Sequence, residues 1–423
     1  MRIFLDSNAP EFFNDISESI RAFYPQAVIT RENISADFLL RLSLIYDREK
    51  IKCSASFFRA NNSMPDGTAE SSLELPALNS PLELKRIRKR VSKLAVFKLM
   101  SKITNIKLPW GSLTGIRPTK LIYERSKMDK RSIIKELTEV YGVAKENVEL
   151  LLRITDAQRP YIQPEKDAVD IYIGIPFCKT RCIYCSFASV DATKGESLIP
   201  GYMRSLIKEI RAVHELIRTR HKRVRCLYIG GGTPTALDDA SFEALLSEIS
   251  VFAPYYEYTI EAGRPDTITL KKLELIKWAG AQRISINPQS MNARTLELIG
   301  RRHTPEEIYS CFEMARNFDF KCINADIIAG LPGESPEDFN YTLNKVKELA
   351  PQNITVHTLS IKKGSELARI LEASPALQNL SQEHADIMVK NARTVLETSG
   401  YNPYYLYRQK YQAGNLENVG YAL

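Results

Sequence analysis

The sequence predicts an α/β protein, an open partial (β/α)6 barrel of TIM-like form with a smaller α+β domain at its N-terminus. Three observations predict this fold. Six apolar, β-branched segments recur after residue 166, glycine or proline turns and amphipathic segments lie between them, and the first 165 residues follow a different pattern. Right-handed crossovers cover both faces of a parallel sheet with helices, so these units predict a parallel sheet. Six strands are too few to close an eight-stranded barrel.

The N-terminal α+β domain is expected over residues 1–165. Within it, LLRLSLIYD (39–47) and KIKCSASFF (50–58) alternate like paired strands. The stretch 84–107 is rich in Lys and Arg, and its apolar residues recur at helical spacing, which predicts an amphipathic basic helix. Its basic residues fit a solvated helix face or, alternatively, a surface for an anionic partner. The apolar residues are Ile87, Val91, Leu94 and Ala95.

The barrel is expected over residues 166–400, and residues 401–423 are expected to begin a C-terminal region. Amphipathic segments such as 202–217 and 241–252 predict helices between the strands. Ligands of such folds gather at the C-terminal ends of the strands, where the unusual residues of this chain lie. The six predicted strands span 169–177, 225–232, 256–263, 282–288, 321–330 and 353–361.

Composition narrows the class of protein. Hydrophobic residues make up 44% and charged residues 26% of the chain, which is typical of a globular protein, and the net charge is +8. No apolar run approaches the ~20 residues of a membrane span, and the first ten residues lack the features of a signal peptide. We therefore expect a cytoplasmic protein. Seven cysteines, three of them within eight residues, favour metal binding over a disulfide framework.

Cys178, Cys182 and Cys185 form the pattern C-x3-C-x2-C directly after the first predicted barrel strand. A structural zinc site would need a fourth Cys or His, and none follows closely, since His214 and His221 lie on a predicted helix and beyond it. A [4Fe-4S] cluster held by three thiolates leaves one iron free to bind a small molecule. The pattern therefore favours such a cluster.

With Tyr184 before its last cysteine, the pattern resembles the signature of the radical S-adenosylmethionine (SAM) enzymes. The segment GGGTP (230–234) resembles the part of that family that meets the methionine amino group, although alone it would indicate only a tight turn. Over roughly 170–364, five motifs resemble the branch that includes oxygen-independent coproporphyrinogen III oxidase and related heme chaperones. They are YIGIPFC, LYIGGGTPT, TIEAGRPD, RISINPQSMNARTLELIGRRH and NADIIAGLPGES. Within the branch, WGSLTGIRPTKL, EAGRPDTIT and YYLYRQKYQAGNLENVGY are most similar to the HemZ type, usually described as coproporphyrinogen dehydrogenase.

The resemblance implies a [4Fe-4S] cluster on the three cysteines and a bound SAM. Tyr172 would contact the methionine part of SAM, Glu261 its ribose or methionine end, and Ile328 would lie beside the adenine. Gln289, Arg301 and Asp326 would hold the ribose and carboxylate, since carboxylates accept from diols and guanidinium groups bind carboxylates in bidentate fashion. Ordinary ion pairs or a helix cap are the alternatives. The SAM-binding residues implied are Tyr172, Gly230, Gly231, Gly232, Thr233, Glu261, Gln289, Arg301, Asp326 and Ile328.

The resemblance also implies an activity in heme biosynthesis. Reductive cleavage of SAM yields a 5'-deoxyadenosyl radical, which takes a hydrogen from the propionate β-carbon of coproporphyrinogen III, and loss of carbon dioxide and an electron leaves a vinyl group. The implied partners are this porphyrinogen and a reductant such as flavodoxin or ferredoxin. Candidate contacts for its carboxylates, each with a surface role as the alternative, are Arg264, Arg302, Arg408 and Lys410.

Two features depart from the family pattern. The established oxidases carry a further cysteine two positions after the third ligand, where this chain has Phe187. Relatives of the HemZ type continue beyond the position of Leu423, so we expect part of the substrate lid to be absent. A heme carrier with the same fold is therefore an alternative function. A radical enzyme acting on RNA is a third, although nucleic acid is not the expected partner.

Overall fold

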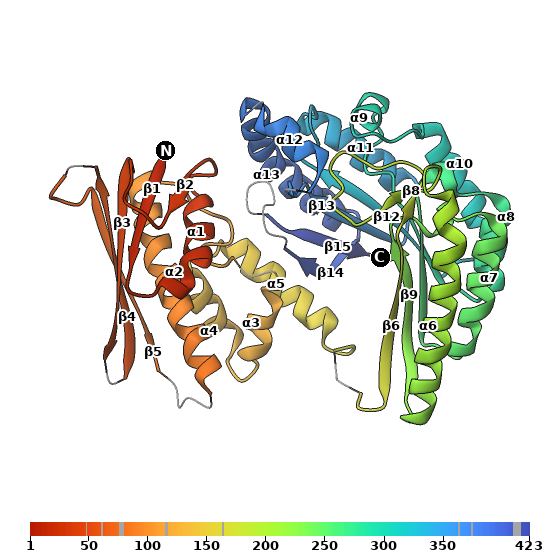
Figure 1. Cartoon of the computed structure of the whole chain (residues 1–423), viewed down its shortest axis with the longest axis horizontal. Coiled ribbons are helices and arrows are strands. Elements are labelled where there is room, and N and C mark those ends of the chain that lie inside the picture. Colours follow the sequence, from red (N-terminus) through yellow and green to blue (C-terminus); the bar gives the residue numbers. More distant parts are fainter. Residues whose placement is uncertain are drawn as a thin grey trace. The chain divides into compact units, whose positions relative to one another are not determined.

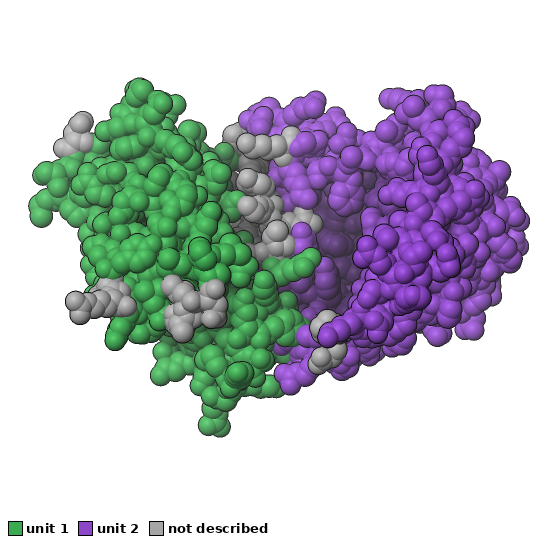
Figure 2. All heavy atoms as spheres, turned by 60° about the horizontal axis from the view of Figure 1, so that its bottom comes forward, with its two compact units in different colours: residues 1–152 green, residues 153–423 purple. Residues whose placement is uncertain are grey.

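The computed structural model describes residues 1–423 except 48, 61, 76–79, 115–116, 163–164, 363, 374 and 409–415. The chain forms two compact units, Met1–Leu152 and Arg153–Leu423, coloured green and purple in Figure 2. The division falls within helix α5 (Lys145–Gln158), upstream of the boundary expected at residue 165.

The first unit is built on a five-stranded sheet in the order β2-β1-β3-β4-β5 (Figure 1). Strand β1 runs parallel to β2 and β3, whereas β3, β4 and β5 pair antiparallel. The expected pairing of 39–47 with 50–58 is confirmed. The strands are β1 (Arg2–Ser7), β2 (Val28–Thr30), β3 (Phe38–Asp47), β4 (Lys50–Arg59) and β5 (Gly67–Glu74). The helices are α1 (Phe13–Arg21), α2 (Pro81–Thr104), α3 (Thr119–Glu124), α4 (Lys130–Lys135) and α5.

Helix α2 is the predicted basic helix. The Ser80 hydroxyl caps it by accepting from the Glu83 amide, and it ends at Asn105, whose φ is 57°. Its predicted apolar residues are all buried, as expected, and Ile87, Val91 and Ala95 join the core of the first unit. On other faces Arg88, Lys89 and Arg90 form ion pairs with acidic side chains of the same unit. Part of the positive charge of α2 is thus compensated within the unit, which favours the interpretation as an ordinary helix face.

The second unit contains an eight-stranded sheet in the order β14-β15-β13-β12-β11-β10-β9-β6. The first six strands in the chain are parallel, which confirms the partial (β/α)6 barrel. They match the six predicted segments, and Figure 1 shows the sheet curled with helices along its outer face. The parallel strands are β6 (Ala168–Ile175), β9 (Arg223–Gly231), β10 (Glu257–Gly263), β11 (Arg283–Ile286), β12 (Cys322–Ala329) and β13 (Asn353–Thr358).

Strand residues alternate between the helix layer and the inside of the half-barrel. On β6, Ile173 and Ile175 are buried, while Tyr172, which precedes them, is 63% exposed. Two of the covering helices, α10 and α11, begin with capping boxes that fix their first turns. The helices are α6 (Ile199–Thr219), α7 (Asp239–Ile249), α8 (Leu270–Trp278), α9 (Ala293–Leu298), α10 (Pro305–Arg316), α11 (Pro336–Glu348), α12 (Glu366–Glu372) and α13 (Pro375–Thr398).

The stretch 401–423 contributes two strands to the same sheet. Strand β15 (Asn418–Ala422) pairs antiparallel with β13, and β14 (Asn402–Tyr407) pairs antiparallel with β15. The two strands extend the sheet beyond its parallel part and bring Asn418 next to the end of β13, where it accepts from the Thr358 amide. Among the described helices, none is both long and apolar enough to cross a membrane.

Candidate active site

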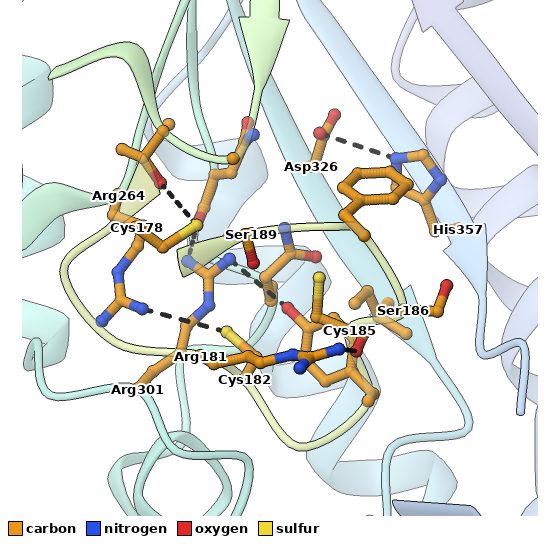
Figure 3. Close-up of a pocket in the computed structure, with 18 of the residues that line it drawn as sticks. Cys178, Arg181, Cys182, Cys185, Ser186, Ser189, Arg264, Arg301, Asp326 and His357 are labelled. Atoms are coloured by element: carbon orange, nitrogen blue, oxygen red, sulfur yellow. Dashed lines mark hydrogen bonds and ion pairs between the residues drawn. The ribbon is translucent and has the colours of Figure 1, made fainter. Parts of the chain in front are cut away.

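A cavity of about 300 Å³ lies at the C-terminal ends of the parallel strands. It is lined by the three cysteines and by most of the residues that the sequence predicts to bind SAM (Figure 3). The predicted residues found on its wall are Cys178, Cys182, Cys185, Gly231, Gly232, Thr233, Glu261, Gln289, Arg301, Asp326 and Ile328. The structure therefore brings together residues from several strands and from the loops that follow them.

The three cysteines surround one side of this cavity. Cys178 ends the short strand β7 (Phe177–Cys178), which pairs with β8 (Val190–Asp191) and so closes the cysteine loop, residues 179–189. The Thr233 hydroxyl donates to Cys178 Sγ at 3.6 Å. Gly232 passes so close that a Cβ there would lie 2.9 Å from the same sulfur, which explains a glycine at this position.

Arg264 anchors the cysteine loop from the end of β10. Its guanidinium is buried, forms an ion pair with Asp266 at 2.9 Å, and donates to the Thr180 carbonyl at 2.8 Å. It also lies 3.9 Å from Cys182 Sγ. Burial alone would raise the pKa of Asp266, but Arg264 outweighs it and the pKa is lowered. Arg264 thus supports the loop, and its charge is already compensated by a carboxylate.

The donor set fits a cluster held by three thiolates. The three thiols are free and face one cavity (Figure 3), and burial raises the pKa of Cys185. Among the described residues, no three His, Cys, Asp or Glu side chains converge closely enough for a single metal ion. His214, a possible zinc ligand by sequence, packs instead on the Phe252 ring. A [4Fe-4S] cluster would be held by Cys178, Cys182 and Cys185.

Glu261, on β10, is a partly buried acid that accepts hydrogen bonds from neighbouring strand β9. The Tyr228 hydroxyl donates to its Oε1 at 2.6 Å. Burial raises the pKa of Glu261 to about 7, with Asp326 acting in the same direction and Tyr228 opposing. Gly230 lies behind this carboxylate, since a Cβ there would be 2.8 Å from Glu261 Oε2. Tyr172 does not line the cavity, and its ring stacks on Tyr228 with centroids 5.9 Å apart.

Asp326, on β12, has polar partners on its own strand and on the neighbouring strand β13. Asn324 donates to Oδ1 at 2.8 Å, and His357 Nε2 on β13 lies 3.6 Å from Oδ2. Burial would raise the pKa of Asp326, but the His357 charge and these hydrogen bonds lower it. Burial would conversely lower the pKa of His357, and Asp326 raises it. The pair therefore favours an ionised aspartate beside a protonated histidine.

Gln289 and Arg301 present buried polar atoms without partners among the described residues. These atoms are Gln289 Oε1 and Arg301 Nε. The Gln289 backbone has a φ of 69° and is held there because its amide donates to the Asp326 carbonyl and its carbonyl accepts from Ile328. Buried polar atoms are normally paired, and backbone strain concentrates at functional sites. An acceptor and a donor at one cavity fit a polar ligand such as the amino acid and ribose of SAM.

The remaining candidate cations lie in different surroundings. Arg302 is exposed and does not line the cavity. Arg408 is buried, and burial lowers its pKa to about 10 while Glu417 opposes this. Lys410 lies outside the described residues. Of the candidate contacts for substrate carboxylates, only Arg264 is on the cavity wall, and it is paired with Asp266.

Sequence reasoning missed several residues of the cavity wall. His357 follows the strand alternation that places Thr355 inside the half-barrel, so the period of β13 could have indicated it. Arg181 and Lys362 also line the cavity, and only their closeness to the cysteines and to the end of β13 could have pointed to them. Phe187, the residue that departs from the family pattern, lines the cavity and is 59% exposed.

Comparisons with known proteins relate the chain to a protein superfamily and to individual proteins of known sequence or structure. The family model described as the radical SAM superfamily matches residues 172–346. The chain is 36% identical to the oxygen-independent coproporphyrinogen-III oxidase-like protein HemZ of Bacillus subtilis, over 92% of this chain and 78% of that protein. It is 28% identical to the heme chaperone HemW of the same organism, over 55% of this chain and 61% of the chaperone. A solved structure, the coproporphyrinogen III oxidase HemN of Escherichia coli, matches with a TM-score of 0.49 and 27% identity, over 58% of this chain and 56% of that chain.

Proposed function

Because the chain belongs to the radical SAM superfamily and, within it, to the oxygen-independent coproporphyrinogen III oxidase-like proteins, we propose that it converts propionate groups of coproporphyrinogen III into vinyl groups. The observation that carries this proposal is the cavity shared by three thiols, two partly buried carboxylates, and atoms of Gln289 and Arg301 that have no partner among the described residues. When bound, a [4Fe-4S] cluster and SAM supply a radical able to take a hydrogen atom from an unactivated carbon.

The residues of the chain bind and orient in this proposal. Asp326, kept ionised beside His357, accepts hydrogen bonds from the ribose hydroxyls of SAM. Arg301 Nε and Gln289 Oε1 receive their missing partners from SAM, whose carboxylate suits the guanidinium. Glu261 lies on β10, two strands away from β12, where it faces the ribose or methionine end.

Tyr172 and Gly230 do not line the cavity, but each lies close to Glu261 or to its hydrogen-bond donor Tyr228. Tyr172 stacks on Tyr228, which in turn donates to Glu261, and Gly230 leaves space for the same carboxylate. We propose that both residues set the position of Glu261. Gly231, Gly232 and Thr233 lie between Glu261 and Cys178, where backbone carbonyls can approach an ammonium group, and Ile328 offers an apolar contact for the adenine.

Phe187 favours a second candidate function, a heme carrier. An exposed aromatic ring at the cavity mouth, where the established oxidases carry a cysteine, suits contact with a porphyrin plane. The chain is also similar, over 55% of its length, to a protein described as a heme chaperone. The paired cations of α2 offer no comparable support for RNA as a substrate.

The test is anaerobic turnover of coproporphyrinogen III by the reconstituted protein with SAM and a strong reductant. We expect 5'-deoxyadenosine and a decarboxylated, vinyl-bearing product to form together. Replacing any one of Cys178, Cys182 or Cys185 by Ala should abolish both products and the brown colour. Replacing Cys53 or Cys322 should abolish neither, since both lie away from the cavity. Tight heme binding without any decarboxylated product would overturn the oxidase in favour of the carrier.

A further inference from the structure

Two cations at the cavity mouth have no role in the SAM site described above. Arg181 belongs to the cysteine loop, and Lys362 belongs to the loop between β13 and α12 (residues 359–365). Figure 3 shows Arg181 on the same loop as Cys185. Both side chains line the cavity, whereas Arg301 lies deeper and is buried.

Neither cation is compensated within the part of the chain that the structure describes. Arg181 makes only long contacts, from Nη2 to the carbonyls of Gly364 at 3.4 Å and Cys185 at 3.5 Å, and no carboxylate lies within ion-pair distance of it or of Lys362. Arg264, the other cation near this loop, is paired with Asp266. Two uncompensated cations at the mouth of one cavity attract an anion.

The cysteine loop is hydrogen-bonded to Leu367 at the start of α12, directly after the loop of Lys362, so the backbone that carries each cation is constrained before any ligand arrives. The Leu367 amide donates to the Ile183 carbonyl at 2.9 Å, and the Ser365 amide donates to the Lys362 carbonyl at 2.8 Å. Ile183 and Ile361, one from each loop, pack against the same hydrophobic cluster, which contains Leu359 and Leu367. Such preorganisation lowers the entropy lost when a ligand binds.

We propose that Arg181 and Lys362 form a carboxylate subsite that holds a propionate group of a tetrapyrrole, with the exposed Phe187 ring against the macrocycle. This inference rests on the porphyrinogen function proposed above. The combination of two cations and an apolar ring suits a planar molecule with carboxylates at its edge. The carboxylate of SAM has the same chemistry as a propionate group, and the experiment distinguishes these two ligands.

The experiment measures binding of coproporphyrin III, the stable oxidised analogue with four propionates, to the anaerobically reconstituted full chain. We expect Arg181→Gln and Lys362→Gln each to raise its Kd about tenfold, since each removes a charged hydrogen bond at a partly exposed site. Arg181→Lys should recover part of the affinity. The Kd of SAM should stay at the wild-type value in all three variants, because Arg301 and Asp326 are intact.

Matched controls remove one positive charge elsewhere on the same unit. Arg220→Gln and Lys271→Gln change exposed residues outside the cavity and should leave both Kd values unchanged. If Arg181→Gln loses the cluster colour, the Kd of coproporphyrin III for Lys362→Gln tests the subsite alone, since Lys362 lies outside the cysteine loop.

Wild-type affinity for coproporphyrin III in the glutamine variants would overturn the subsite while leaving the proposed function intact. A weakened affinity for SAM alone would assign the two cations to SAM and likewise overturn the subsite. Failure of the wild-type chain to bind any tetrapyrrole would instead overturn the porphyrinogen function, and the subsite with it.

Discussion

At the scale of single residues, the cavity contains carboxyl groups whose surroundings shift their pKa values away from the usual ones. Glu261 is a carboxyl group whose burial raises the pKa from 4.5 to about 7, despite a hydrogen bond from Tyr228. Asp326 shifts the other way, because the charge of His357 lowers the pKa of Asp326 although burial would raise it. Two carboxylates at one cavity therefore differ in charge near pH 6, and the difference comes from their neighbours.

Glu261 predicts a pH-dependent stability. Its folded pKa is raised, so its favourable contribution is fully present below about pH 4.5 and is lost as the pH rises to about 7. The difference corresponds to about 3 kcal/mol, at 1.36 kcal/mol per pKa unit. Thermal unfolding of the cluster-free chain should show Glu261→Gln gaining stability relative to wild type between pH 5 and pH 8.

Tyr228→Phe serves as the control for this prediction. It removes the hydrogen bond that lowers the pKa of Glu261, so the loss of stability should move to higher pH. Parallel pH profiles for wild type and Glu261→Gln would show that Glu261 does not titrate in this range.

Gln289 combines a strained backbone with an unpartnered side-chain oxygen. We expect Gln289→Gly to be more stable than Gln289→Ala by about 1 kcal/mol, because only glycine adopts a positive φ without strain. Both variants should weaken SAM binding about tenfold through the lost hydrogen bond. Thermal unfolding and calorimetric titration with SAM measure the two effects.

Ala350→Gly is the matched control, since Ala350 has a φ of 44° and does not line the cavity. It should gain stability and keep the wild-type affinity for SAM. Unchanged SAM affinity in both Gln289 variants would remove Gln289 from the proposed site.

At the scale of elements, the cysteine loop depends on a residue outside it. Arg264 and Asp266 follow β10, yet Arg264 reaches the Thr180 carbonyl and lies close to Cys182. The other side of the loop is held through the bond from Leu367 to Ile183. A loop carrying two of the three proposed cluster ligands is thus fixed from two neighbouring elements.

Breaking the Arg264 anchor should reduce both stability and cluster content. Arg264→Leu leaves Asp266 buried without its partner, which costs about 3–5 kcal/mol, and frees the Thr180 carbonyl. The double variant Arg264→Leu with Asp266→Leu should recover most of the stability but not the cluster content, measured as iron per chain. Full cluster content in the double variant would show that the loop does not need the anchor.

At the scale of the whole molecule, two compact units carry separate cores. The core of α2 and the five-stranded sheet contains residues of the first unit alone. The cavity is built entirely from the second unit. A ligand of the cavity should therefore stabilise one unit directly.

Calorimetric unfolding should reveal this division. We expect cluster reconstitution and SAM to raise the Tm of one transition, that of the second unit, because binding stabilises only the fold that binds. At a SAM concentration of 100 times its Kd the gain is about 2.7 kcal/mol. Equal shifts of all transitions would show that the two units unfold together.

Much of the fold was predictable because it depends on local patterns. The six strands and the amphipathic helix α2 follow from residue spacing, and C-x3-C-x2-C lies within eight residues. The strands β14 and β15 were not predicted, because antiparallel pairing with β13 depends on contacts between distant segments. The placement of the cavity at the strand ends follows from parallel topology itself.

The sequence by itself determined the kind of chemistry: three thiols in one loop, a glycine-rich turn, and polar residues at strand ends. Only the tertiary structure decided which charged side chains are paired with an opposite charge. Arg264, a candidate for binding substrate, is paired with Asp266, and His357 lies beside Asp326. Arg181 and Lys362, by contrast, have no carboxylate partner among the residues that the structure describes. The physical reason is that spacing along the chain sets which groups are present, while the partners of a charge come from other elements.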